Sequence, residues 1–336
     1  MYSLCVIRGD GVGPEVISET LLLLEGTSLK FNISEAYAGY QCYLDNGSSL
    51  PEDTVKKCEK SDAILFGAVT TPPIIENYFS PIVRLRKILD LYANVRPFYS
   101  LPLKSSRQNI DFVIVRENTE DLYAGKERKT KIGAEATRII TKKASEKIIR
   151  FAFELAIKQN RKKVTVVHKA NILRLTDGLF LKIAEEVHSE FPEIEMDYML
   201  VDSCALNLVK KPDIFDIIVT TNMFGDILSD EAAALIGGLG VAASANIGES
   251  HALFEPVHGS APKYQGKNVI NPVAAFFAAC LMLEYLGEFK KALSLKKAII
   301  QTIKNNCVTF DLGGNAKTSE VTREVIINYK KIYDHN

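Results

Sequence analysis

The sequence lacks an excess of either charge and lacks any block of basic residues. Its 336 residues include 41 Lys and Arg against 41 Asp and Glu, for a formal net charge of +0. Binding to nucleic-acid phosphates or to a membrane surface depends on clustered positive charge, so we expect neither partner. With 47% hydrophobic residues, a chain of this length predicts two lobes with a cleft between them.

Long apolar runs and paired cysteines are missing too. The longest apolar run, residues 273–283, is far shorter than the ~20 residues that span a bilayer, so it predicts a buried helix. The first residues show neither the basic region nor the long apolar region of a signal peptide. The six cysteines lie too far apart for a disulfide framework or a zinc site. We therefore expect buried free thiols and a cytoplasmic protein.

Short apolar runs alternate with amphipathic segments along the chain. They predict strands at residues 4–7, 63–67, 112–115, 164–167 and 217–219, and helices at 15–24, 144–158 and 179–190. Strands that are apolar throughout have both faces covered, which indicates an α/β protein. No repeat or flexible linker separates the lobes, so the chain is expected to cross between them. Residues 120–140 predict either an arm or hairpin used in subunit contact or, about equally, an exposed loop.

A glycine-rich loop, GDGVGP at residues 9–14, joins the first predicted strand to the first predicted helix. Glycines in this position let backbone amides approach a phosphate. The dinucleotide pattern G-x-G-x-x-G, however, needs glycine where Pro14 stands. The loop therefore favours a tight turn with proline at the helix start, and a standard Rossmann fold is disfavoured.

Two aspartates, Asp226 and Asp230, follow the predicted strand at 217–219 with a spacing of four residues. A helix would direct both carboxylates the same way. Paired carboxylates suit Mg²⁺ or Mn²⁺, which complete their coordination with substrate and water. An N-cap beside a surface acid is the alternative, and this pattern alone slightly favours it.

Arginines form a second pattern, at Arg84, Arg86, Arg96 and Arg116. Guanidinium groups bind carboxylates with two parallel hydrogen bonds, so several of them suit a substrate with two or three carboxylates. Each arginine alone is more often a solvated or ion-paired side chain.

Candidates for proton transfer are Lys169 and Tyr123. Lys169 follows the strand at 164–167, where partial burial near other charges can lower the pKa of an amine enough for it to act as a base. Tyr123 is a candidate general acid or a packed tyrosine. The Gly/Pro/His segment at 254–264 is suited to enclosing an adenine and ribose, or is a rigid surface loop.

Together these motifs resemble the metal-dependent β-decarboxylating dehydrogenases, the family of isocitrate, 3-isopropylmalate and homoisocitrate dehydrogenases. The resemblance runs nearly end to end and rests on residues 9–15, 93–97, 115–120, 168–171, 225–230 and 258–262. It implies an isopropylmalate dehydrogenase-like, two-lobed α/β fold with a mixed β-sheet covered by helices. The large cofactor-side domain would comprise residues 1–92 and 237–336. The small dimerisation and metal-site domain would comprise 93–236, with an arm at about 120–140.

The resemblance also implies roles for individual residues, in a homodimer or dimer of dimers with shared active sites. Tyr123 would be the proton donor and Lys169 the base. The metal ligands would be Asp202, Asp226 and Asp230, with Lys169, Asn171 and Asp202 reaching in from the partner chain. Substrate-binding residues would be Ser80, Ile82, Val83, Arg86, Arg96, Arg116 and Asn171. Cofactor-binding residues would be Thr70, Thr71, His258, Gly259, Ser260, Ala261, Pro262, Lys263, Tyr264 and Asn271.

The segment before Arg86 bears on the substrate. Isocitrate enzymes of the bacterial type carry Ser-x-Asn at positions 80 and 82, whereas this chain has Ser80 but Ile82. Isopropylmalate enzymes carry an acid and a Leu-Leu pair, where this chain has Phe79 and Ile82-Val83. The segment most resembles homoisocitrate dehydrogenases, which implies oxidative decarboxylation of homoisocitrate to 2-oxoadipate in lysine biosynthesis through 2-aminoadipate. Isocitrate or dual activity, then 3-isopropylmalate, are the enzymatic alternatives, and a regulatory subunit is the non-enzymatic one.

The cofactor motif differs from that of the NAD-dependent members, which carry an aspartate where this chain has Lys263-Tyr264. A lysine can pair with the 2′-phosphate of NADP, so the motif favours NADP over NAD. Phe310 stands near the place of a tyrosine that NADP enzymes use, and their following arginine is not matched. The resemblance further implies Mg²⁺ or Mn²⁺.

Overall fold

The fold is built on one large, mixed β-sheet. The structure, a computed structural model, describes residues 1–72, 75 and 78–334. The sheet strands are β1 (Tyr2–Ile7), β2 (Phe31–Ala36), β3 (Ala63–Phe66), β4 (Ala93–Tyr99), β5 (Asp111–Glu117), β8 (Lys163–His168), β9 (Glu195–Leu200), β10 (Ile217–Thr220), β11 (Ala243–Ile247) and β12 (Ala252–Pro256). Their order is β2-β1-β3-β12-β11-β4-β5-β10-β8-β9.

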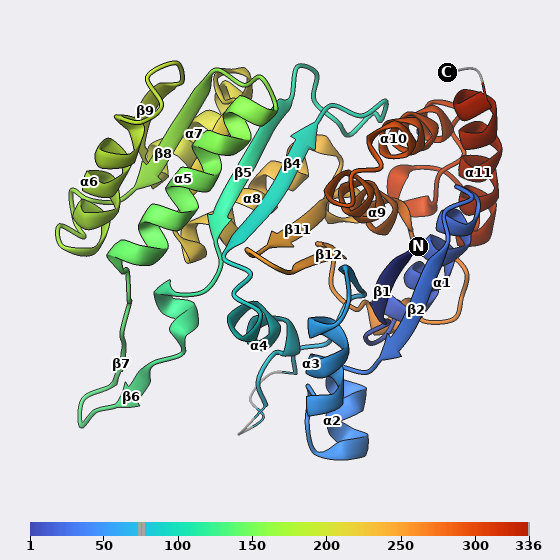
Figure 1. The fold of residues 1–336 in the computed structure, drawn as a ribbon, viewed down its shortest axis with the longest axis horizontal. Coiled ribbons are helices and arrows are strands. Elements are labelled where there is room, and N and C mark those ends of the chain that lie inside the picture. The colour runs from blue at the N-terminus through green and yellow to red at the C-terminus, as the bar shows by residue number, and fades with distance from the viewer. Residues whose placement is uncertain (73–74, 76–77, 335–336) are drawn as a thin grey trace.

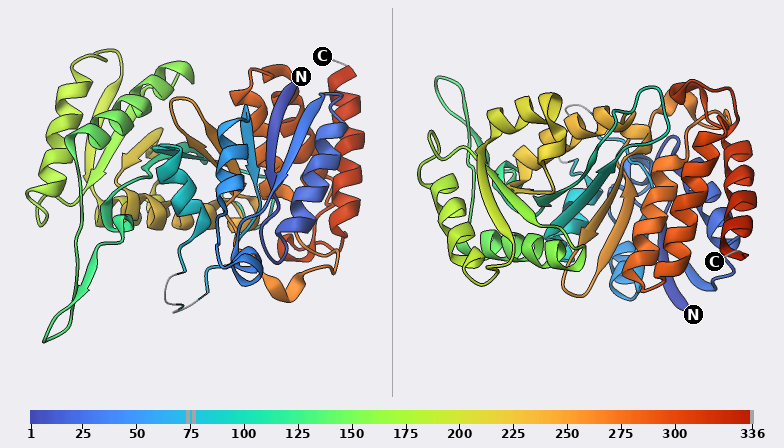
Figure 2. Two further views of the ribbon diagram at one scale, coloured as in Figure 1. Left: turned by 60° about the horizontal axis from the view of Figure 1, so that its bottom comes forward. Right: turned by 90° about the horizontal axis from the view of Figure 1, so that it is seen from above.

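Helices cover the sheet on both sides (Figures 1 and 2). They are α1 (Gly13–Glu25), α2 (Tyr40–Asn46), α3 (Glu52–Glu59), α4 (Pro81–Ile88), α5 (Lys142–Lys158), α6 (Thr176–His188), α7 (Val201–Lys210), α8 (Asn222–Ile236), α9 (Val273–Tyr285), α10 (Phe289–Lys304) and α11 (Thr318–Asp334). The α/β class and the mixed, helix-covered sheet are confirmed. Within the sheet, β4 runs antiparallel to β5 and β11, and β11 runs antiparallel to β12.

Both ends of the chain contribute to the same part of the sheet. Strands β1–β3 come from the N-terminal part, and β11 and β12 come from the C-terminal part. Figure 1 shows blue α1 beside red α11, and the two helices pack on each other. The chain crosses over as the absence of a linker predicts, and the expected division at residues 92 and 237 stays a prediction.

The predicted elements form with small shifts at their ends. The helix expected at 179–190 begins earlier, at Thr176, because Asp177 and Gly178 make its first turn look like a loop in the sequence. The apolar run at 273–283 forms α9, which packs on β11 and β12 and confirms the expected buried helix. In the described part of the chain, no helix is long and apolar enough to cross a membrane.

All six cysteines are free thiols, as the sequence predicts. Five are buried, but Cys307 is only half-buried, so its expected burial is wrong. Cys307 directly precedes the buried Val308, beyond the end of α10. It lies where the chain leaves a helix rather than on a helix face that packs on the core.

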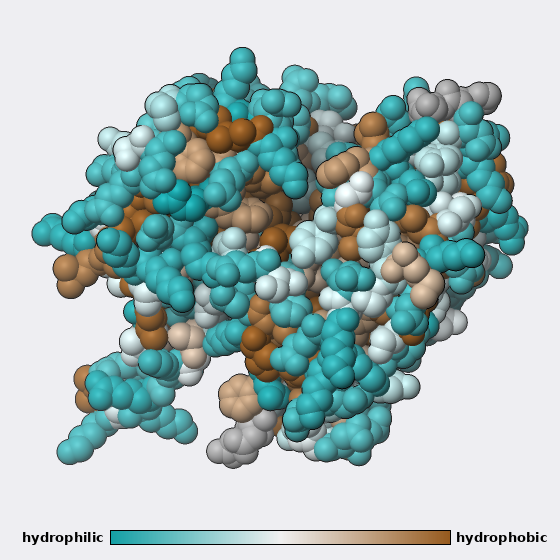
Figure 3. Space-filling model, viewed as in Figure 1, coloured by the Kyte–Doolittle hydropathy of each residue, from teal (hydrophilic) through white to brown (hydrophobic). Residues whose placement is uncertain are grey.

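The segment at 120–140 contains a hairpin, with strands β6 (Glu127–Lys129) and β7 (Ala134–Ala136). The hairpin projects from the molecule in Figure 2, and Ile132 at its tip is 100% exposed. The same segment is mostly hydrophilic in Figure 3, at the lower left, whereas apolar side chains gather nearer the middle of that face. The hairpin conformation is confirmed, and its role in subunit contact stays a prediction.

The topology brings separate motifs to one edge of the sheet. Strands β5, β8 and β10 are parallel neighbours, so their carboxyl ends meet there. Open α/β sheets bind ligands at this edge. The antiparallel strand β4 begins beside the end of β5, with Ala93 opposite Glu117. The motifs at 93–97, 115–120, 168–171 and 225–230 therefore lie at or near the same edge.

Candidate active site

Three buried arginines from three neighbouring elements line one cavity of about 430 Å³. Arg86 comes from α4, Arg96 from β4 and Arg116 from β5, and their side chains are 9%, 6% and 1% exposed. Arg84 lies on the same helix as Arg86 but does not line this cavity. A buried guanidinium is costly unless it is paired, so the partners of these arginines define the site.

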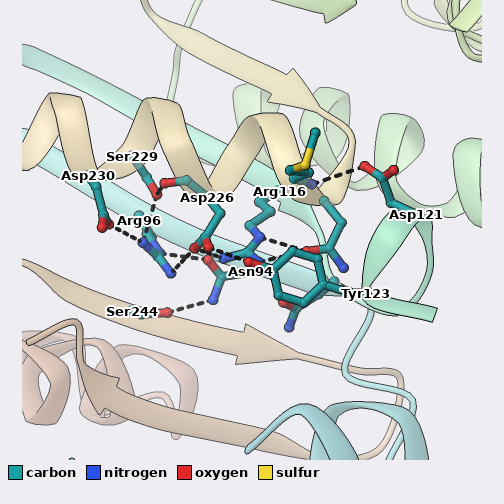
Figure 4. Close-up of polar contacts among 12 residues, drawn as sticks. Asn94, Arg96, Arg116, Asp121, Tyr123, Asp226, Ser229, Asp230 and Ser244 are labelled. Carbon is teal, nitrogen blue, oxygen red and sulfur yellow. Dashed lines mark hydrogen bonds and ion pairs between the residues drawn. The ribbon is translucent and has the colours of Figure 1, made fainter. Parts of the chain in front are cut away.

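Arg116 is fixed by the start of α8. Its Nε and Nη2 atoms donate to Oδ1 of Asn222 at 3.0 and 2.7 Å, and its Nη1 atom donates to Asp226. Burial, together with the charge of Arg86, lowers the pKa of Arg116 to about 10, so it stays charged at neutral pH. Figure 4 shows Arg116 between β5 and α8, beside Asp226.

Arg96 binds the same helix one turn farther on. Its Nη1 atom donates to Oγ of Ser229 at 2.7 Å and to Oδ1 of Asp230 at 3.3 Å, while Nη2 lies 3.5 Å from Oδ1 of Asp226. Its Nε atom donates to Oδ1 of Asn94 at 2.9 Å. Asp226 and Asp230 thus share a face of α8, as their spacing predicts, and both contact Arg96.

Arg86 retains a free donor. Its Nη2 atom donates to Oε1 of Glu255 at 3.0 Å, but its buried Nε atom has no hydrogen-bond partner among the described residues. An unpaired buried donor on a cavity-lining side chain fits an acceptor that a bound carboxylate would supply. Ser80, Ile82 and Val83 line the cavity beside Arg86, with the last two forming an aliphatic wall.

Tyr123 and Asp226 form the proton-bearing part of the site. Tyr123 lies in a short 3₁₀ helix, Asp121–Ala124, and its hydroxyl donates to Oδ2 of Asp226 at 2.5 Å. Burial, and then this hydrogen bond, raise the pKa of Tyr123, so the phenol keeps its proton at neutral pH. Burial also acts to raise the pKa of Asp226, but Arg116, Tyr123 and Arg96 outweigh it and bring the pKa below its ordinary value. An ionised carboxylate therefore faces a protonated phenol.

The donor set fits a hard divalent cation only in part within one chain. Asp226 and Asp230 supply two carboxylates, and Mg²⁺ commonly uses one or two together with substrate and water. Asp202 lies elsewhere, at the start of α7, where its hydrogen bond from Lys169 lowers its pKa. Across residues 1–72, 75 and 78–334, no three His, Cys, Asp or Glu side chains gather as a metal centre would require.

Three predicted site residues lie away from the arginine cavity: Lys169, Asn171 and Asp202. Lys169 and Asn171 follow β8 in the loop before α6, and Asn171 is exposed. Lys169 instead pairs with Asp202 at the surface of the same chain. One chain therefore carries two separate groups of predicted catalytic and metal-binding residues.

A second cavity, of about 310 Å³, adjoins the first through His258 and Gly259. Its lining includes Ala261, Tyr264 and Asn271, and the rings of Tyr264 and Phe310 lie 5.5 Å apart. Within the part of the chain that the structure describes, the buried Nε2 atom of His258 has no hydrogen-bond partner, and burial lowers the pKa of this imidazole. A mostly apolar pocket with adjacent aromatic rings and one unpaired nitrogen fits an adenine ring.

The remaining predicted cofactor residues border the two cavities. Thr71 lines the arginine cavity, and Oγ1 of Thr70 lies 2.6 Å from Oγ of Ser260. Pro262 begins the 3₁₀ helix Pro262–Tyr264, in which the Nζ atom of Lys263 lies 4.9 Å from the ring centroid of Tyr264. Lys263 is exposed, so its ammonium is available to a ligand.

The glycine-rich loop at 9–14 packs against the segment that carries Ser260. The Asp10 carboxylate accepts backbone N–H bonds from Tyr40, Gln41 and Thr70 at 2.8, 3.0 and 2.8 Å. Gly11 has φ +58°, and a Cβ there would lie 2.1 Å from the carbonyl oxygen of Ser260. The tight-turn interpretation is confirmed, because the loop packs directly against the segment at 260.

Some functional contacts are absent from the sequence prediction. Long-range packing brings Glu255 to Arg86 and Asn222 to Arg116. The available signals were weak: Glu255 stands just before the Pro/His/Gly loop, and Asn222 stands just before the motif at 225–230.

Comparisons with known proteins agree with this geometry. The family model described as isocitrate/isopropylmalate dehydrogenase matches residues 3–325. The chain belongs to this family. A homoisocitrate dehydrogenase of Methanocaldococcus jannaschii is 52% identical, with 98% of each chain covered. An isocitrate/homoisocitrate dehydrogenase of Thermus thermophilus is 48% identical over 98% of this chain and 99% of that protein.

Other members of the family are almost as similar. A 3-isopropylmalate/3-methylmalate dehydrogenase of Methanocaldococcus jannaschii is 48% identical over 97% of this chain and 98% of its own length. The crystal structure of isocitrate dehydrogenase from Methylococcus capsulatus superposes with a TM-score of 0.95 at 42% identity, covering 98% of this chain and 100% of that one. Family membership makes this chain an NAD(P)-dependent decarboxylating dehydrogenase that uses a divalent metal and binds a small carboxylate substrate.

Gly225 offers a test of the packing between α8 and Arg116. A Cβ at Gly225 would lie 2.5 Å from Cγ and 2.6 Å from Cβ of Arg116, so Gly225→Ala must displace that side chain. We expect KM for the carboxylate substrate to rise by about 10-fold or more, because a misplaced guanidinium loses its bidentate geometry. Gly178→Ala is the control: its Cβ meets nothing within 4 Å, and it should leave KM unchanged. Equal KM values for the two variants would contradict the packing argument.

The carboxyl group of Glu120 predicts a pH dependence of stability. It accepts hydrogen bonds from the backbone nitrogen and Oγ1 of Thr141 at 2.7 and 2.9 Å, and burial raises its pKa from 4.5 to about 7. The folded chain therefore binds a proton between these pH values that the unfolded chain releases. The contribution of Glu120 to the free energy of unfolding should fall as pH rises from 4.5 to 7.

Urea unfolding across this pH range checks the Glu120 prediction. Glu120→Gln should flatten the pH dependence, whereas Glu135→Gln, at an exposed hairpin position, should leave it as in the wild type. A Glu120→Gln curve that runs parallel to the wild-type curve would show that Glu120 does not titrate as proposed.

Proposed function

We propose that the chain catalyses the NAD(P)- and divalent-metal-dependent oxidative decarboxylation of homoisocitrate to 2-oxoadipate. The observation that carries this proposal is the convergence of three buried arginines on one cavity with an aliphatic wall at Ile82 and Val83. Homoisocitrate has three carboxylates and one methylene more than isocitrate. The arginines suit the carboxylates, and the aliphatic wall suits the added methylene.

The names of the relatives support the reaction more strongly than the substrate. Homoisocitrate, isocitrate and 3-isopropylmalate dehydrogenases are all found among the relatives that are between 45% and 52% identical to this chain. The choice among them therefore rests on the wall formed by Ile82 and Val83. Isocitrate is the second candidate, favoured by the hydroxyl of Ser80 in the same cavity. One methylene changes the transition-state energy by only about 1–3 kcal/mol, so dual activity is compatible with this pocket.

The residues divide the chemistry among them. When bound, the nicotinamide would accept the hydride from C2, and the divalent cation would polarise the 2-hydroxyl and stabilise the enolate left by CO2 loss. Asp226 and Asp230 would hold the cation, together with Asp202 of a second subunit. Arg86, Arg96 and Arg116 would orient the substrate carboxylates, in a cavity where burial strengthens their hydrogen bonds.

Proton transfer falls to Tyr123 and Lys169. The hydroxyl of Tyr123 already points at the carboxylate of Asp226, and its raised pKa keeps the proton available. It would donate that proton to the carbon from which CO2 has left. Lys169 of the second subunit would accept the proton of the 2-hydroxyl, either directly or through a neighbouring aspartate or water.

Shared active sites follow from the placement of Lys169, Asn171 and Asp202 outside their own chain's cavity. Large apolar side chains are exposed on the same elements and on the adjoining β9, at Ile172, Leu175, Tyr198, Leu206 and Val209. Such a patch is typical of a surface that another protein covers. We infer a homodimer, alone or within a dimer of dimers, in which the 93–236 domain and its hairpin form the contact. This grouping of residues 93–236 apart from 1–92 and 237–336 belongs to the proposal.

Steady-state rates with Mg²⁺ test the substrate and the coenzyme. Homoisocitrate should have a higher kcat/KM than isocitrate or 3-isopropylmalate, and NADP should be preferred to NAD because Lys263 is available to its 2′-phosphate. Ile82→Asn should shift preference toward isocitrate by about 10-fold, since it replaces aliphatic wall with a hydrogen-bonding side chain. Ile88→Asn, an exposed change on the same helix, is the control.

The outcomes of this comparison separate two failures. Wild-type preference for isocitrate or 3-isopropylmalate would keep the reaction and overturn the interpretation of Ile82 and Val83. An unchanged substrate ratio in Ile82→Asn would do the same. A higher kcat/KM with NAD would overturn the role of Lys263.

Subunit mixing tests the shared sites. Asp226→Asn and Lys169→Ala chains should each be inactive as homodimers, because each lacks one group in both sites. Random co-assembly should restore about a quarter of wild-type activity, since half of the dimers then contain one complete site. Asp226→Asn mixed with Arg96→Gln is the control and should stay inactive, because both residues belong to the same side. Recovery in both mixtures, or in neither, would contradict shared sites.

A further inference from the structure

A buried charge cluster lies behind the candidate active site, at the carboxyl ends of β5, β8 and β10. Asp121 and Asp177 are fully buried, and Arg138 lies between them. The Nε atom of Arg138 donates to Oδ1 of Asp121 at 2.6 Å, Nη1 donates to Asp177, and Nη2 donates to Oγ1 of Thr221 at 2.8 Å. Its guanidinium carbon also lies 4.9 Å from the ring centroid of Phe224. All three nitrogens of one guanidinium are therefore used.

The second oxygen of each aspartate fixes a backbone segment of the site. Oδ2 of Asp121 accepts the N–H of Met223 at 3.0 Å, in the first turn of α8 and three residues before Asp226. Oδ2 of Asp177 accepts the N–H of Lys169 at 2.6 Å. Figure 4 shows Asp121 beside α8, on the same side as Tyr123. Each carboxylate thus joins Arg138 to a segment that carries a candidate catalytic or metal-binding residue.

The backbone at Asp121 is strained. Its φ of +69° lies in the left-handed region, which residues other than glycine adopt mainly where the surroundings impose it. Here Arg138 and Met223 hold the side chain, and the Asp121 N–H donates to the carbonyl of Ile139 at 2.9 Å. Because Asp121 and Tyr123 share one 3₁₀ turn, this conformation sets where the Tyr123 hydroxyl points.

We propose that Arg138 is a positioning residue for the dehydrogenase reaction. Through Asp121 it places Tyr123 and the turn of α8 before Asp226, and through Asp177 it places Lys169. The inference rests on the proposed function. In a dimer with shared sites, Tyr123 and Asp226 serve one active site and Lys169 serves the other, so Arg138 links parts of both sites within one chain.

Lysine cannot replace arginine in this role. An ammonium group is a compact charge, whereas the guanidinium fork reaches two aspartates and Thr221 in fixed directions. Arg138→Lys keeps the charge that the two buried carboxylates need, so it disturbs position more than charge balance.

The chain contains a matched control in Arg161. Its Nη2 atom donates to Oδ1 of Asp111 at 2.6 Å and its Nη1 atom to Oδ1 of Asp216 at 3.0 Å. Oδ2 of Asp216 in turn accepts the N–H of Lys162 at 2.6 Å. The pairing is similar, an arginine between two aspartates, but it lies at the opposite ends of β5, β8 and β10, and its aspartates are more exposed than Asp121 and Asp177. Arg161→Lys therefore reports the cost of weakening such a cluster away from the site.

The experiment compares wild type, Arg138→Lys and Arg161→Lys by steady-state kinetics and by amide hydrogen exchange without ligands. In Arg138→Lys we expect kcat to fall about 10–100-fold while KM changes by less than about threefold, because the three substrate arginines are untouched. Exchange should accelerate at the amides of Lys169 and Met223. Arg161→Lys should keep kcat within about twofold of wild type and leave those two amides protected.

Three results would overturn the proposal: kcat of Arg138→Lys within about twofold of wild type, an equal loss in both variants, or a loss without faster exchange at Lys169 and Met223. If Arg138→Lys does not fold, Asp177→Asn replaces it, since Arg138 then keeps one buried charge partner. It should give the same kcat loss. If wild type turns over none of the three substrates, the proposed function fails, while the exchange comparison still decides whether Arg138 positions these segments.

Discussion

The structure of the site depends on the carboxylate of Asp226, which two buried arginines contact at Oδ1 and Tyr123 contacts at Oδ2. Arg116 is 1% exposed, and a guanidinium so deeply buried requires a charged partner. The fold supplies that partner because α8 begins two residues after β10 ends, next to β5. Gly225 then lets α8 approach the aliphatic part of Arg116.

Charge balance explains why the arginines alone do not complete the site. Within one chain, Arg86 pairs with Glu255, and Arg96 and Arg116 pair with Asp226 and Asp230. A substrate with three carboxylates would therefore enter a cavity with no spare positive charge. A divalent cation held by Asp226 and Asp230, as proposed, would supply the missing charge and would also free the arginines to bind substrate. The same argument favours completion by the Lys169 ammonium of a second subunit.

The elements and the motifs follow from the sequence, but the pairings between them do not. Alternating apolar runs predict β5, β8 and β10, and the spacing of Asp226 and Asp230 predicts one helix face, since both are local properties. Glu255 lies 169 residues from Arg86, so only strand order brings the two together. The role of Arg138 cannot be predicted from the sequence either. Its partners Asp121 and Asp177 come from a 3₁₀ turn and a helix start that have no sequence pattern of their own. The family resemblance, and not any sequence pattern, is the basis for expecting Lys169 and Asp202 in the active site of another chain.

The most direct test is a crystal structure with Mn²⁺ and homoisocitrate, located by the anomalous signal of the metal. The account predicts a single strong peak within about 2.0–2.3 Å of carboxylate oxygens of Asp226 and Asp230, with Asp202 of a second subunit as the third ligand. Arg86, Arg96 and Arg116 should contact the substrate carboxylates in the same map. A metal bound away from Asp226, or a site completed by Asp202 of the same chain, would contradict it.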